Sequence, residues 1–102
     1  MWDPNMNYGN VKRQRYLNIF IISRDEGTLK EILSRLNNVF TSKGVNCRIE
    51  VKRSLIIPNF IYIRIVPQET VNLKDLKDCV SECLNDVGKN IIWSKVEIIE
   101  VK

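Results

Sequence analysis

Three cysteines are the side chains in this sequence best suited to metal or nucleophilic chemistry. Cys79 and Cys83 are four positions apart, which places them on one face of a helix, and Cys47 lies far upstream. Zinc takes four protein ligands, or three with an open catalytic position, and the chain has no histidine to complete such a set. Without histidine the usual general base, and the usual activator of a serine or cysteine nucleophile, are also missing. We therefore expect small buried thiols in a protein that is not an enzyme, with no catalytic residue, metal or cofactor.

Two short segments, 16–22 and 60–66, carry a second and more informative set of side chains. In both, isoleucine or leucine at every second position alternates with aromatic and polar residues, which is typical of a half-buried strand. Aromatic residues and arginine are enriched at protein interfaces, so the alternate positions predict a partner-binding surface. The predicted binding residues are Tyr16, Asn18, Phe20, Phe60, Tyr62 and Arg64.

The same surface has two other interpretations. Aromatic side chains on an open sheet also stack the bases of single-stranded nucleic acids. Alternatively, the surface is simply covered, either by the first fifteen residues or by a second copy of the chain, which would make a homodimer. We favour a protein or peptide partner, bound as an extended segment or subunit where the halves of the chain meet, because the basic excess is small.

The basic residues gather in the first half of the chain. Residues 1–53 hold ten Lys or Arg against five Asp or Glu, whereas residues 54–102 hold six against seven. Such asymmetry favours an anionic partner, although a net charge of +4 also serves solubility alone. If nucleic acid binds, Arg24 and Arg64 join six possible phosphate contacts, namely Lys12, Arg13, Arg15, Arg48, Lys52 and Arg53.

The elements that position these residues follow from periodicity and end signals. A capping box of Thr28 and Glu31 begins a helix that Gly44 ends, and Asn72 and Gly88 frame a second helix. Residues 1–15 lack periodicity and are predicted to form a flexible arm before a single domain, 16–102. The predicted strands are 16–22, 46–53, 60–66 and 93–101, the last with uncertain register, and the predicted helices are 29–43 and 73–87.

An offset of 44 residues relates the two halves. Asn72 lies 44 positions after Thr28, and Gly88 lies 44 positions after Gly44. The same offset separates the first residues of the two aromatic strands, 16–22 and 60–66. We interpret 16–53 and 60–102 as two βαβ repeats from an internal duplication. Together they predict a ferredoxin-like α+β sandwich, βαββαβ, with a four-stranded antiparallel sheet and two helices on one face.

Composition also indicates the cellular compartment of the protein and the kind of genome that encodes it. An odd number of cysteines and no apolar leader favour an intracellular, reducing compartment over secretion, and leave open whether Cys47 bridges Cys79 or Cys83. No apolar run reaches the length of a membrane span, so we expect no membrane association. The chain has no alanine and abundant Ile and Asn, as an AT-rich genome would encode.

With its small size and lack of an enzyme signature, the chain resembles the orphan proteins of crenarchaeal filamentous viruses, of the Acidianus filamentous virus type. The resemblance concerns overall character and repeated architecture. It implies a viral protein in the host cytoplasm and carries over no functional residue.

Overall fold

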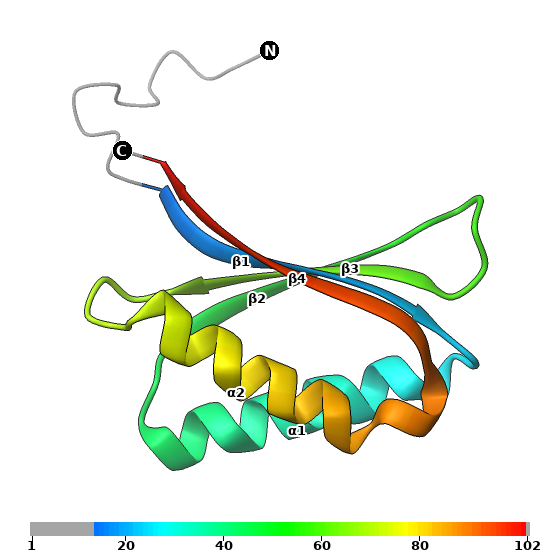
Figure 1. The fold of residues 1–102 in the computed structure, drawn as a ribbon, viewed down its shortest axis with the longest axis horizontal. Helices are drawn as coiled ribbons and strands as arrows, with labels where there is room; N and C mark the ends of the chain where they lie inside the picture. Colours follow the sequence, from blue (N-terminus) through cyan, green and yellow to red (C-terminus); the bar gives the residue numbers. More distant parts are fainter. Residues whose placement is uncertain (1–13, 102) are drawn as a thin grey trace.

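The chain folds as one antiparallel sheet with two helices packed against one side of it. The structure, a computed structural model, describes residues 14–101. Its strands pair in the order β2-β3-β1-β4, and both helices lie on the same side of the sheet (Figure 1). The predicted ferredoxin-like α+β fold is therefore confirmed. The elements are β1 (Gln14–Ser23), α1 (Gly27–Lys43), β2 (Cys47–Arg53), β3 (Phe60–Pro67), α2 (Leu73–Asp86), the short 3-10 turn η2 (Gly88–Asn90) and β4 (Ile91–Val101).

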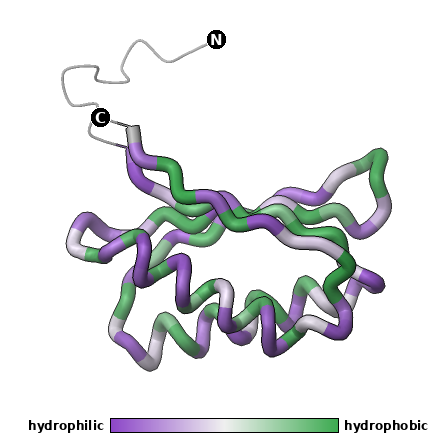
Figure 2. The backbone as a smooth tube through the Cα atoms, in the orientation of Figure 1, coloured by the Kyte–Doolittle hydropathy of each residue, from purple (hydrophilic) through white to green (hydrophobic). Residues whose placement is uncertain are grey.

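The core lies between the sheet and the helices, and the alternation in the two central strands creates it. Leu17, Ile19 and Ile21 of β1 are buried, as are the isoleucines of β3. Apolar residues at helical spacing on α1 and α2 close over them, because burying both faces together removes the most apolar surface from water. Green and purple segments follow one another along both helices in Figure 2, as expected for helices that bury one side. The other face of the sheet has no helix over it; we call it the open face.

The pairing register of β1 with β3 is the one expected if the two halves of the chain are related by a two-fold axis. Ile19 of β1 lies directly opposite Ile63 of β3 in antiparallel pairing. These two residues are 44 positions apart, so an offset of 44 places a pseudo-two-fold axis between them. The internal duplication itself stays a prediction.

The two helices begin differently, and this corrects one predicted cap. The first residue before α1 is Glu26, and Thr28 lies within the first turn with its side chain buried. The carboxylate of Asp25 does the capping instead, because its Oδ1 accepts from Thr28 N at 3.0 Å and from Thr28 Oγ1 at 2.9 Å. The predicted Thr28–Glu31 capping box is therefore wrong. Asn72 does cap α2, and Gly44 ends α1 in the left-handed conformation, as predicted. Gly88 does not end α2 in that way, because α2 ends at Asp86 and Gly88 begins η2.

The Asp25 cap leads to a first testable prediction. Replacing Asp25 with alanine should lower the free energy of unfolding by about 1–2 kcal/mol, because one backbone N–H and a buried hydroxyl lose their acceptor. Urea unfolding followed by circular dichroism measures this. The matched control is Glu26→Ala, since Glu26 is the neighbouring acid and makes no capping bond with its side chain. Equal losses in the two variants would contradict the assignment.

The first strand begins earlier than predicted. Residues 1–13 of the expected arm lie outside the described residues, but β1 already includes Gln14 and Arg15. The Arg15 guanidinium donates to the carbonyls of Glu69 at 2.9 Å and Val71 at 2.6 Å, and forms an ion pair with Glu100 at 3.5 Å. Arg15 therefore ties β1 to the loop between β3 and α2. Within residues 14–101, neither helix is long and apolar enough to cross a bilayer.

Candidate functional site

All six residues of the predicted partner surface lie on the open face. Pairing of β1 with β3 places Asn18 opposite Arg64 and Phe20 opposite Tyr62. Tyr16 and Phe60 lie on the same face toward opposite ends of these strands, and all six side chains are half-buried. The alternation in the sequence was sufficient to bring them together, because successive side chains of a strand point to opposite faces.

The middle of the open face is a connected polar network. The Tyr62 hydroxyl donates to Asn18 Oδ1 and accepts from Arg64 Nε at 2.9 Å. The Arg64 guanidinium also lies over the Tyr16 ring, 4.2 Å from its centroid. The hydrogen bond to Tyr62 raises the pKa of Arg64, and the side chain remains charged. These contacts hold Arg64 against the sheet, and the bond to Tyr62 occupies its Nε–H donor.

One end of the open face is apolar. Phe20 and Tyr62 pack ring to ring, with centroids 5.2 Å apart. In the next row of the sheet, Phe60 lies opposite Ile22 on one side of β1, and Trp93 lies opposite Ile22 on the other. Trp93 is 46% exposed, and the others are half-buried without a helix above them. We call these five residues the apolar end.

The turn between β2 and β3 is also apolar. Leu55 and Ile56 are 101% and 90% exposed, and Ile57 follows them. Ser54 organises the turn, because its Oγ accepts from the backbone N–H groups of Ile56 at 3.1 Å and Ile57 at 2.9 Å. The turn projects beyond the sheet, and its tip is green in Figure 2. These three residues, the apolar tip, lead directly into Phe60 and the apolar end.

Sequence reasoning missed the apolar tip and two members of the apolar end. Ile22 continues the alternation of Tyr16, Asn18 and Phe20, so its place on the open face was predictable. Trp93 was not, because the register of the last strand was undetermined. Three apolar residues between Ser54 and Pro58 are unusual in a turn, and that run was the available signal.

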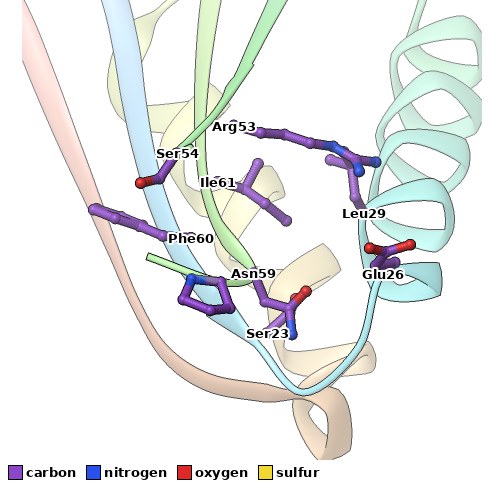
Figure 3. Close-up of a pocket in the computed structure, with 9 residues that line it drawn as sticks. Ser23, Glu26, Leu29, Arg53, Ser54, Asn59, Phe60 and Ile61 are labelled. Carbon is purple, nitrogen blue, oxygen red and sulfur yellow. The ribbon is translucent and has the colours of Figure 1, made fainter. Parts of the chain in front are cut away.

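The predicted phosphate contacts do not form one surface. Arg48 and Lys52 belong to the open face of β2, whereas Arg53 pairs with buried Ile61 and belongs to the helix side. Figure 3 shows the Arg53 side chain reaching from β2 toward Leu29 and Glu26 at the start of α1, beside a cavity of about 210 Å³. The guanidinium of Arg15 binds the loop between β3 and α2 at the end of the sheet. Lys12 and Arg13 lie outside the described residues. The predicted set is thus divided between two faces.

A second cavity, of about 280 Å³, brings three arginines to one end of the sheet. Each guanidinium there already has partners. Arg15 binds two carbonyls and Glu100, Arg64 binds the tyrosines, and Arg48 forms an ion pair with Glu50 at 3.0 Å. A phosphate would have to compete for these contacts, so the cavity is a poor anion site. Its lining is Gln14, Arg15, Tyr16, Arg48, Arg64, Val66, Pro67 and Glu69.

The seam between the halves cannot accept an added strand. β1 and β3 pair with each other from Leu17–Ile65 to Ile22–Phe60. Their facing backbone groups are therefore used within the sheet, and strand addition is available only at the outer edges of β2 and β4. Side chains on the open face of the seam remain accessible to a ligand that lies across them.

The cysteines lie on the helix side and are not paired. All three are free thiols. Burial raises the pKa of the Cys47 thiol, and burial together with the nearby Asp86 carboxylate raises that of Cys83, which disfavours the reactive thiolate. In the part of the chain that the structure describes, no group of three Cys, Asp or Glu side chains could hold a metal ion.

Comparison with known proteins supports the fold. No protein-family model matches the sequence, and no curated protein is similar to it. Among solved structures, the chain is similar to a formyltetrahydrofolate deformylase from Pseudomonas syringae pv. tomato, with a TM-score of 0.60 and 11% identity. The similarity covers 91% of this chain and 29% of the deformylase, so this chain spans less than a third of that protein. At this identity the likeness shows a shared fold alone.

Proposed function

We propose that this protein is a non-enzymatic protein–protein interaction module. Its ligand is an extended peptide or a partner subunit that lies over the seam of β1 and β3 on the open face. The observation that carries the proposal is the exposed apolar side chains of the apolar end and of the apolar tip, which precedes Phe60 in the chain. Exposed apolar patches lower the solubility of an isolated small protein, and they mark sites of interaction with other proteins.

Nucleic-acid binding through the same face is the alternative, and two observations disfavour it. The Phe20 and Tyr62 rings pack against each other, so their faces are partly withdrawn from stacking with bases. The charges on this face are mixed, because Arg48 pairs with Glu50 and Lys95 pairs with Glu97 at 3.4 Å. A binder of single strands needs a run of unpaired cations along the path of the backbone.

Peptide display against the intact protein tests the proposal. We expect enrichment of peptides with aromatic or aliphatic side chains at alternating positions, because these fit a sheet face. Their affinity should change little with added salt, since few counterions are released. Failure to enrich any peptide would contradict the proposal. So would tight, salt-sensitive binding of labelled single-stranded oligonucleotides that Tyr62→Ala abolishes.

Phe60 is the residue of the apolar end that follows the apolar tip in the chain, and its truncation gives the second prediction. Phe60→Ala should weaken binding of a selected peptide by about tenfold, because aromatic anchors dominate interface energies. Leu33→Ala is the matched control, since Leu33 is also a partly buried apolar residue but lies on α1, on the far side of the sheet. Fluorescence titration compares the two variants. Equal weakening would mean that general destabilisation, and not the open face, is responsible.

A further inference from the structure

The outer edge of β4 is one of the two outer edges of the sheet that the described residues form. β4 ends the sheet order, is 11 residues long and contains neither proline nor glycine. Within residues 14–101, no other strand pairs with this edge. It also carries three exposed apolar residues, Ile92 at 60%, Trp93 at 46% and Ile98 at 40%. Long uncovered edges pair with other strands unless charge, proline or a bulge prevents it. The register shift of β4 lies at its start, where Ile22 pairs with Trp93 and Ser23 with Ile91, so the stretch around Val96 is regular.

We propose that β4 pairs antiparallel with β4 of a second copy of this chain, with the two-fold axis at Val96. The two four-stranded sheets would then form one continuous eight-stranded sheet. This proposal concerns the edge of the sheet and does not rest on peptide binding at the open face.

Symmetry limits how two copies of one edge can pair. The two-fold axis of an antiparallel pair stands perpendicular to the sheet, so paired side chains lie on the same side of it. Residues equally distant from the axis, one on each protomer, are therefore opposite each other. Each choice of residue on the axis fixes every cross-strand pair, and the alternatives can be compared directly.

The charges of β4 select one of these alternatives. With Val96 on the axis, Lys95 lies opposite the partner's Glu97, and Glu97 lies opposite the partner's Lys95. Lys95 and Glu97 also form an ion pair within the chain, so the four charges alternate in sign. An axis at Lys95 or Glu97 would place that residue opposite its own copy, so like charges would meet. An axis at Ser94 or Ile98 would place Lys95 and Glu97 opposite apolar residues or the strand end. Opposite charges across a strand pair stabilise it, and like charges destabilise it.

The same register pairs two of the three exposed apolar side chains of the edge, and the third, Ile92, falls opposite the partner's Glu100. Trp93 falls opposite the partner's Ile99 on the open face, and Ile98 falls opposite the partner's Ser94 on the helix side. Val96 meets its own symmetry mate there. The pairing also matches both faces, because both pairs of helices lie on one side of the continuous sheet.

The other edge is less suited to this contact. β2 has only seven residues and carries Arg48, Lys52 and Arg53 against Glu50. Two copies of β2 would therefore bring together two positively charged strands. β4 is longer, and its charges compensate one another across the axis, so the second copy belongs at β4.

Charge reversal gives the third prediction and tests both the dimer and its register. Sedimentation equilibrium of the full chain should show a monomer–dimer equilibrium. Lys95→Glu or Glu97→Lys alone should raise the dimer Kd about tenfold, because by symmetry each change converts two attractive pairs into two repulsive ones. The double variant Lys95→Glu/Glu97→Lys should restore dimerisation to within about threefold of the original Kd, since every pair is again opposite in charge. A chain that stays monomeric, or a double variant as weak as the single ones, would overturn the proposal.

Cysteine cross-linking tests the register independently. Opposite residues of an antiparallel pair have Cα atoms about 4.5–5.5 Å apart, within the range that a disulfide spans. Val96→Cys should therefore form a covalent dimer on oxidation. Lys95→Cys and Glu97→Cys should not, because their symmetry mates are displaced along the strand, and the unmodified chain controls for its native thiols. Cross-linking through position 95 or 97 in preference to 96 would contradict the axis at Val96.

Discussion

Replacing Ile63 with alanine should lower the free energy of unfolding by about 3–4 kcal/mol, one of the largest losses expected from a single truncation in this chain. Ile63 is fully buried at the centre of β3, directly opposite the equally buried Ile19. β3 pairs with β1 on one side and β2 on the other, so the backbone cannot move to fill the space that the side chain leaves. The variant would keep most of that cavity, and the cost of a cavity adds to the lost transfer energy.

Urea unfolding followed by circular dichroism measures this loss. Ile56→Ala is the control, because it removes the same atoms from a side chain that is 90% exposed. We expect that variant to stay within about 0.5 kcal/mol of the original chain. Truncation of a buried isoleucine to alanine typically costs more than about 2 kcal/mol. A loss of less than about 1.5 kcal/mol for Ile63→Ala would therefore mean that Ile63 does not lie in the core.

The fold was predictable because strong local signals agreed with one another. Alternating isoleucines in the two central strands fixed which side of each strand is buried, and apolar residues at helical spacing supplied the layer above them. Asn72 and Gly44 mark helix ends through backbone chemistry that acts within a few residues. Thr28 was misassigned because Asp25, three residues earlier, competes for the same cap, and the sequence alone does not decide between two capping side chains.

The candidate site was predictable only where strand alternation controls it. The six residues of β1 and β3 share a face for that reason. Trp93 joined them through the register of β4, which depends on contacts far apart in the sequence. The basic residues separated because neighbours such as Lys52 and Arg53 must point to opposite faces. Their charges were visible in the sequence, but their division between faces follows from the boundaries of β2.

The apolar tip gives the prediction with the largest expected effect on function. Leu55→Ser/Ile56→Ser should weaken binding of a selected peptide or partner by about a hundredfold, while the free energy of unfolding changes by less than about 0.5 kcal/mol. The two side chains are almost wholly exposed, so the folded chain gains no burial energy from them. Covering each against a partner would remove an apolar surface worth about 1.5–3 kcal/mol from water. Ser54, which holds the turn, is unchanged in this variant, so the path of the backbone should persist.

This variant separates binding from folding more cleanly than any change within the sheet. Titration of the same labelled peptide against the tip variant and the unmodified chain measures the effect, and urea unfolding of both verifies that the fold is intact. Lys89→Ser is a suitable control, because Lys89 is an exposed residue of η2 and does not belong to the apolar tip. Unchanged peptide affinity in the tip variant would confine the interaction to the open face. Exposed leucine and isoleucine at the end of a strand hairpin would then need another explanation, since they disfavour solubility and contribute nothing to the core.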